Sequence, residues 1–179
     1  DSGKACGAVY LYRTVNASYA FAQKLVPPSS VAGDSFGAAV AFSSSGGHLV
    51  IGAPGRKPAS YTNEGTAYIF AQTGATWTYQ TTLDPTEGNT GTYIGTAVAI
   101  SEDGSVVVVG SNANDTTTLP NGAAFVFTRI GVAWTQATTL LPASYTAGMK
   151  FGNSVAVSLD GRWIAVGAPN YAANGVIFG

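Results

Sequence analysis

Short apolar segments recur along the whole chain, and turn-forming residues separate them. The stretch FGNSVAVSLDGRWIAVGAP, from Phe151 to Pro169, is typical: two apolar bursts are joined by Asp160-Gly161 and end at Gly-Ala-Pro. The segments are rich in β-branched and aromatic residues, and none shows the periodicity of an amphipathic helix. The pattern predicts an all-β chain of short strands joined by tight turns.

The same stretch occurs three times. Its copies begin at Phe36, Ile94 and Phe151 and align without a gap, spaced by 58 and then 57 residues. A second block of the form GxxYxF has the same period, with an aromatic residue twelve positions after its glycine in each copy. The block begins at Gly7, Gly65 and Gly122, and the aromatic residues are Tyr19, Trp77 and Trp134. Two blocks in one register indicate a repeat protein.

Each repeat contains four predicted strands, and four antiparallel strands in a repeat of this length predict a β-propeller blade. VVVVG is apolar throughout, as expected of an inner strand between neighbouring blades, whereas TWTYQTTL alternates and fits an outer edge. The chain then holds about three blades in a single propeller segment spanning 1–179, with one blade split between the two termini. The segments are 1–26 (third and fourth strands of the split blade), 36–84 and 94–141 (complete blades), and 151–179 (first and second strands and the start of a third at Gly175–Phe178).

These residues resemble the FG-GAP repeat family, known from integrin α chains, and its bacterial and protist branch in particular. Phe36-Gly37 with Gly52-Ala53-Pro54, and Phe151-Gly152 with Gly167-Ala168-Pro169, carry the two name-giving elements. The copy that begins at Ile94-Gly95 departs from both. The resemblance implies an extracellular β-propeller that serves adhesion or ligand recognition.

The resemblance also raises the question of calcium, which integrin-like blades bind in an Asp-rich loop between the first two strands. Ca²⁺ takes six to eight oxygen ligands, several from carboxylates. Here the loop offers two carboxylates at best (Glu102 and Asp103) and none in the copy at 43–46. We therefore expect no cofactor, with calcium as the alternative that the low ligand count disfavours, and we interpret Asp103 and Asp160 as turn residues followed by glycines with positive φ.

Three blades cannot close a propeller, which usually needs four to eight. The first interpretation is that the chain is a fragment of a longer propeller. The second is self-assembly, either as two chains in a six-bladed ring or head to tail through the cut blade. Partners are then copies of the chain or the rest of a longer propeller.

Composition excludes several functions. Only 9% of residues are charged and the net charge is −1, so no basic surface for nucleic acid is expected. No apolar run is long enough to insert into a membrane. Cys6 is the single cysteine, which leaves a free thiol or an intermolecular bridge as the alternatives. His48 is the single histidine, and its repeat equivalents Val106 and Trp163 favour packing over general-base catalysis, so we expect no enzyme.

The connections that vary between repeats are the candidates for binding. Those from second to third strands and from fourth strands to the next blade are expected on the same face. Their tyrosines, together with Asn and Asp, suit contacts with proteins or glycans. The candidate residues are Arg56, Lys57, Tyr61, Tyr93, Asn114, Asp115, Tyr145, Lys150 and Tyr171. Asn16 and Asn114 also fit the N-glycosylation pattern.

The sequence thus predicts a non-enzymatic, extracellular or cell-surface propeller protein. Its expected role is adhesion or structural assembly through protein–protein contacts, including head-to-tail self-assembly. The alternative is a glycan-binding lectin of propeller type.

Overall fold

The computed structural model describes residues 5–57, 63–87, 90–113, 121–144, 146, 148–173 and 176–177. The candidates Tyr61, Asn114, Asp115 and Tyr145 lie outside these residues. The described part contains strands and turns but no helix, and therefore no helix that could cross a membrane. This confirms the predicted all-β fold class.

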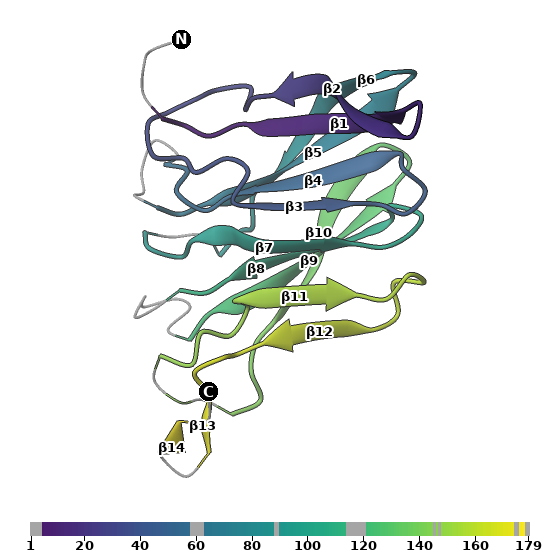
Figure 1. Cartoon of the computed structure of the whole chain (residues 1–179). Helices are drawn as coiled ribbons and strands as arrows, with labels where there is room; N and C mark the ends of the chain where they lie inside the picture. Colours follow the sequence, from purple (N-terminus) through teal and green to yellow (C-terminus); the bar gives the residue numbers. More distant parts are fainter. Residues whose placement is uncertain are drawn as a thin grey trace.

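Two four-stranded antiparallel sheets form the centre of the molecule (Figure 1). In each sheet the strands lie side by side in chain order, so the first and fourth strands are the edges. The first sheet consists of β3 (Ala39–Phe42), β4 (His48–Ala53), β5 (Thr66–Thr73) and β6 (Thr76–Leu83). The second consists of β7 (Ile94–Ile100), β8 (Val106–Ser111), β9 (Ala123–Ile130) and β10 (Ala133–Leu140). These sheets have the strand arrangement expected of FG-GAP blades.

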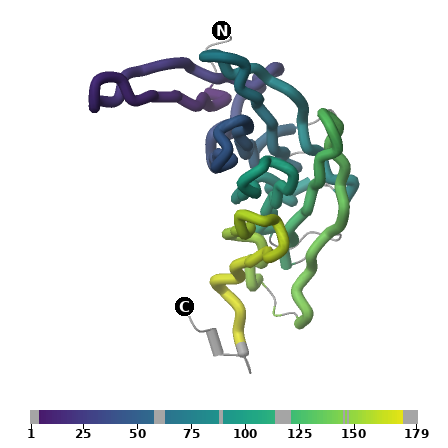
Figure 2. The backbone as a smooth tube through the Cα atoms, turned by 90° about the vertical axis from the view of Figure 1, so that its right-hand side faces the viewer, coloured from purple at the N-terminus to yellow at the C-terminus, as the bar shows by residue number. Residues whose placement is uncertain are grey.

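Two-stranded sheets flank the complete blades at either end (Figure 1). At one end β1 (Val9–Val15) pairs with β2 (Ser18–Leu25), and at the other β11 (Ser154–Val157) pairs with β12 (Ile164–Gly167). By repeat position, β1 and β2 are third and fourth strands, and β11 and β12 are first and second strands. The sheets are stacked along an arc that does not close into a ring (Figure 2).

The final segment differs from the expected start of a third strand. Val176–Ile177 (β14) pairs with Ala172–Ala173 (β13), not with β12. In the complete blades the third strand has neighbours on both sides, whereas a fourth-strand partner is absent here among the described residues. The local hairpin satisfies backbone groups that would otherwise stay unpaired.

The core lies between the blades. One cluster joins the β3–β6 sheet to the β7–β10 sheet, and the other joins β1 and β2 to the β3–β6 sheet. The second strands β4 and β8 are almost wholly buried, as predicted for VVVVG, and the first five residues of the third strands β5 and β9 are buried too. Each blade therefore needs a neighbour on both faces to bury its apolar residues.

A backbone link repeats wherever one blade meets the next. The amide groups of Phe36, Ile94 and Phe151 donate to the carbonyl oxygens of Cys6, Glu64 and Asn121, at 2.9, 2.9 and 2.8 Å. Each link joins the start of a third strand to the first strand of the following blade. The same register is therefore imposed three times along the arc.

Candidate interaction face

The described parts of the variable connections lie on one face, which we call the loop face. It is formed by connections from second to third strands and from fourth strands to the next blade, on the left in Figure 1. In the complete blade β3–β6 the two kinds of connection contact each other: Tyr93 N–H donates to the carbonyl of Asn63 at 3.1 Å. The described loop-face residues are 26–35, 54–57, 63–65, 84–87, 90–93, 112–113, 121–122, 141–144, 146, 148–150 and 168–171.

Ser35, Tyr93 and Lys150 occupy equivalent positions on the loop face, immediately before Phe36, Ile94 and Phe151, the residues that bridge to the preceding sheet. All three adopt the left-handed conformation, with φ of 57°, 52° and 56°. This conformation is uncommon for residues other than Gly, Asn and Asp, and it recurs at functional sites. One backbone geometry thus presents three different side chains, a hydroxyl, a phenol and an ammonium group.

Arg56 contacts other residues of the protein and does not extend freely into solvent. Its Nη1 lies 2.9 Å from Asp84 Oδ1, and its guanidinium lies 5.6 Å from the ring centroid of Tyr68. Burial, and then the charge of Asp84, raise the pKa of the neighbouring Glu64, which Arg56 opposes. Arg56 therefore balances local negative charge, and the adjacent Lys57 is the exposed cation of this connection.

Asp34 and Tyr68 each have a buried polar atom in this part of the molecule. Asp34 accepts the amide proton of Val31 through Oδ2 at 2.9 Å, but its buried Oδ1 has no hydrogen-bond partner. The hydroxyl of Tyr68 is also buried and unpartnered, and burial raises the pKa of Tyr68 to about 12, against the opposing effect of Arg56. Asp34 occupies the position of Thr92 and Met149 in the other repeats, which are buried too. This position is therefore buried in all three repeats.

Tyr93 and Tyr171 remain accessible, at 40% and 38% exposure. The hydroxyl of Tyr93 accepts a hydrogen bond from Asn63 Nδ2 at 3.4 Å, and the hydroxyl of Tyr171 lies 3.2 Å from Ser144 Oγ. Lys150 is half-buried. The described part of the loop face thus combines oriented tyrosines with cations.

The opposite side, which we call the turn face, carries the hairpins between first and second strands. Asp103 Oδ1 accepts the hydroxyl proton of Ser101 at 2.7 Å and the amide proton of Ser105 at 2.9 Å, and these bonds lower the pKa of Asp103. Asp160 makes equivalent bonds to Ser158 and to the amide of Arg162. The glycines that follow have φ of 69° and 72°, which confirms the predicted turns.

The residues of these turns do not fit calcium. Their carboxylates serve the turn itself, and the described residues include no group of three or more His, Cys, Asp or Glu placed to hold a metal ion. We therefore assign no chemistry to a metal in this loop.

The turn face contains a feature that sequence reasoning missed. A hollow of about 390 Å³ lies between the β1–β2 hairpin and the neighbouring complete blade. Phe42 and Trp77, whose rings meet edge to face at 5.3 Å, form part of its wall. The other lining residues are Leu11, Tyr12, Arg13, Ala22, Gln72, Gly74 and Ala75. The only signal in the sequence was the aromatic residue at a fixed position of each repeat.

His48 occupies the equivalent space one blade further on. Its ring meets Trp134 edge to face at 6.5 Å and lies against the backbone of Gly104. Burial, and then the charge of Arg129, lower the pKa of His48. His48 thus packs between two blades, in line with the packing role expected from its repeat equivalents.

Fold and site together define a propeller-repeat protein in which rigid blades carry variable loops. The family model for the FG-GAP repeat matches residues 19–70, 77–127 and 134–177. Because these matches cover most of the sequence, the chain belongs to the FG-GAP repeat family. No curated protein matches the chain significantly.

Proposed function

We propose that this chain is a non-enzymatic, extracellular or cell-surface protein that acts in adhesion or structural assembly through protein–protein contacts. The main support is the repeated left-handed position on the loop face. Ser35, Tyr93 and Lys150 share one backbone geometry while their side chains differ. A rigid scaffold that varies only the displayed side chains suits recognition, because little conformational entropy is lost on binding.

Adhesion between copies can be measured with beads that carry the protein. We expect wild-type beads to aggregate, and we expect the double variant Tyr93→Ser with Lys150→Ser, which gives both positions the residue of the first repeat, to reduce aggregation. Ile130→Ser is the matched control, because Ile130 is 84% exposed but lies outside the loop face. If wild-type beads stay dispersed, adhesion between copies is ruled out.

The lectin alternative predicts a different result. Aromatic side chains beside polar groups are the usual composition of sugar sites, and the hollow at Phe42 and Trp77 has this composition. Saturable binding to one class of glycan on an array, abolished by Trp77→Ala, would favour the lectin. Protein-mediated bead aggregation that free sugars do not inhibit would favour adhesion.

A further inference from the structure

We propose that a second copy of this chain completes the split blade. Strands β11 and β12 of one copy would lie beside β1 and β2 of the other, as first and second strands lie beside third and fourth strands in a complete blade. The inference rests on the proposed assembly role and specifies its partner and register. The complete blades supply the pattern, because each of their contacts has a repeat equivalent at the two open ends of the arc.

The first contact is an aromatic one. In the β3–β6 blade, Phe36 packs edge to face on Tyr68 at 5.4 Å, and Tyr68 is 1% exposed. The equivalent of Tyr68 in the split blade is Tyr10, which is 55% exposed. The equivalent of Phe36 that would cover it is Phe151, at the opposite end of the chain. A second copy brings the two together.

The inner edge of the first complete blade is also uncovered. Val40 and Phe42 on β3 are 52% and 53% exposed. Their equivalents on β7, Val98 and Ile100, pack against the core cluster because the preceding blade supplies a second strand beside them. The exposed face of β3 therefore corresponds to a surface that the preceding blade covers in the next repeat.

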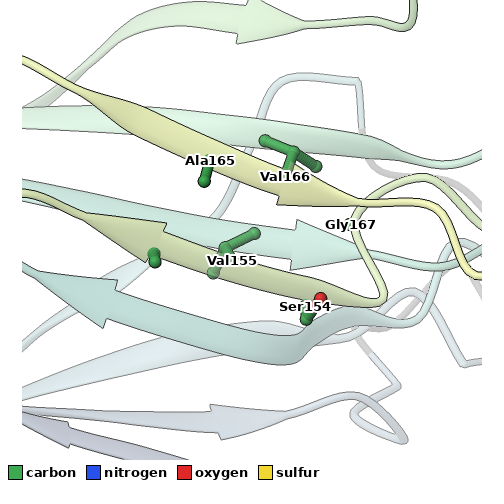
Figure 3. Close-up of a pocket in the computed structure, with 6 residues that line it drawn as sticks. Ser154, Val155, Ala165, Val166 and Gly167 are labelled. Carbon is green, nitrogen blue, oxygen red and sulfur yellow. The ribbon is translucent and has the colours of Figure 1, made fainter.

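A glycine near the end of the second strand in each complete blade lies where the backbone of the following blade makes contact. Gly110 lies so close to the carbonyl oxygen of Gly152 in the following blade that a β-carbon would not fit. At the equivalent Gly167, the three atoms nearest to an added β-carbon all belong to Ser154 of the same sheet, and both residues line a hollow on β11 and β12 (Figure 3). In a second copy, the carbonyl of Gly37 would take the place of the Gly152 carbonyl.

The hollow on the turn face has a matching side chain. His48 fills the space between two blades by packing on Trp134. By repeat position, its equivalent in a completed split blade is Trp163, which is 78% exposed, and the equivalent of Trp134 is Trp77 in the wall of the hollow. A β-carbon added to the turn glycine Gly46 would meet no atom within 4 Å, so room remains beside it. We infer that Trp163 of the second copy enters this hollow.

The strand register follows from the complete blades. There Ile51 on the second strand lies opposite Tyr68 on the third, so Val166 of one copy should lie opposite Tyr10 of the other. The edge of β12 is open to such a strand among the described residues, since β14 pairs with β13. When two copies complete each other's split blade, the two junctions are identical and the assembly is a closed dimer.

Analytical ultracentrifugation of the whole chain tests the association. We expect a dimer for the wild type and at least about a tenfold weaker association for Trp163→Ala, because a large aromatic residue seated in a hollow acts as a hot spot. Ile130→Ala should leave the association unchanged. A monomer over the whole concentration range would overturn the proposal, and so would a dimer that Trp163→Ala does not weaken.

A cross-linking experiment tests the register. In a Cys6→Ser background, Tyr10→Cys combined with Val166→Cys places two thiols directly opposite each other, within the Cα separation of a disulfide. Tyr10→Cys combined with Ala165→Cys is the matched control, because a shift of one residue turns the side chain to the other face. Oxidation should link two chains only in the first variant. Equal linkage in both, or linkage in neither, would overturn the register.

The outcomes also separate this inference from the proposed function. A cross-linked dimer whose beads do not aggregate would refute adhesion and support the completed blade. If the beads aggregate but the free protein is a monomer in the ultracentrifuge, adhesion is supported and the completed blade is refuted. Glycan binding in the hollow of a monomer would overturn the dimer and favour the lectin.

Discussion

Gln23 holds the backbone of Trp77 in the next blade by two hydrogen bonds. Its Nε2 donates to the carbonyl oxygen of Trp77, and its Oε1 accepts the amide proton of the same residue, both at 2.8 Å. The pair joins outer strands β2 and β6, which are otherwise barely in contact. One amide side chain thus ties the two-stranded sheet to the complete blade.

We expect Gln23→Ala to lower the free energy of unfolding by about 1–2 kcal/mol, since two hydrogen bonds are lost. Urea denaturation measures this value, and hydrogen exchange at the Trp77 amide should accelerate in parallel. Gln80→Ala is a suitable control, because Gln80 occupies an outer strand of the neighbouring blade and has a buried Oε1 without a partner. An unchanged midpoint for Gln23→Ala would show that the two bonds are replaced by water at no cost.

Glu87 forms a second link between outer elements. It accepts hydrogen bonds from Gln136 Nε2 and Thr139 Oγ1, both at 2.7 Å, across the boundary to the next blade. Burial of Glu87 disfavours its charge, but the hydrogen bonds from Gln136, Thr139 and Thr86 outweigh this and lower its pKa. The stabilisation is therefore present at neutral pH and is lost as the pH falls through the folded-state pKa.

The expected cost of Glu87→Ala at neutral pH is about 1 kcal/mol, because the site is partly exposed to solvent. The difference in unfolding free energy between wild type and variant should shrink in acid, below the ordinary carboxyl pKa. A difference that stays constant from pH 7 to about pH 3 would assign the effect to packing instead of charge.

His48 should make stability depend on pH in the neutral range. Burial and Arg129 lower its pKa, so protonation is easier in the unfolded chain. The contribution of neutral His48 is therefore present above the ordinary histidine pKa of about 6.5 and is lost as the pH falls below that value. We expect the wild type to lose stability between pH 7.5 and pH 5.5, roughly the range that spans this pKa.

His48→Val, which installs the residue of the next repeat, should remove this pH dependence while keeping the blades packed. Thermal melts of both proteins at the two pH values provide the comparison. Parallel losses of stability in wild type and variant would show that another group is responsible.

Much of the fold could be predicted because it is repeated. One alignment placed every long strand, and the apolar run of β8 correctly indicated burial on both faces. The burial of the first part of β5 was harder to predict, because the segment AYIF contains Tyr68 among apolar residues. The hydroxyl group of Tyr68 is buried as well. The tyrosine is buried because the neighbouring blade covers it, a tertiary effect that local pattern cannot report.

The site was less predictable, for physical reasons that differ between residues. The loop face followed from strand order, but Ser35, Tyr93 and Lys150 have no intrinsic preference for the left-handed conformation, so nothing local signals it. The sequence indicated Arg56 as a binding residue, but in the structure Arg56 pairs with Asp84. The two residues are 28 positions apart, and only the folding of the blade brings them together. The hollow at Trp77 exists only between two sheets, and no single repeat contains it.

Asn16 offers a test of the predicted N-glycosylation site. It lies with Ala17 at the tip of the β1–β2 hairpin, where φ values of 49° and 60° define a tight turn and leave the side chain exposed. Expression in a secreting eukaryotic cell should add an N-linked glycan there. Intact mass before and after enzymatic deglycosylation measures it, with Asn16→Gln as control, and an unchanged mass at this site would exclude it.

Two glycines at equivalent positions should respond differently to the same substitution. Gly110 abuts the carbonyl oxygen of Gly152 in the neighbouring blade, so Gly110→Ala forces the sheets apart and should prevent folding or cost several kcal/mol, of the order of an overpacked core. Gly167→Ala meets mainly the hydroxyl of Ser154, which can rotate away, so the variant should fold with a melting temperature near that of the wild type. Circular dichroism measures both. If Gly167→Ala unfolds the chain as Gly110→Ala does, its surroundings are as closed as an inter-blade contact. If it folds but no longer dimerises in the ultracentrifuge, the added methyl group blocks the approach of the second copy at the position where a following blade lies in the complete pairs.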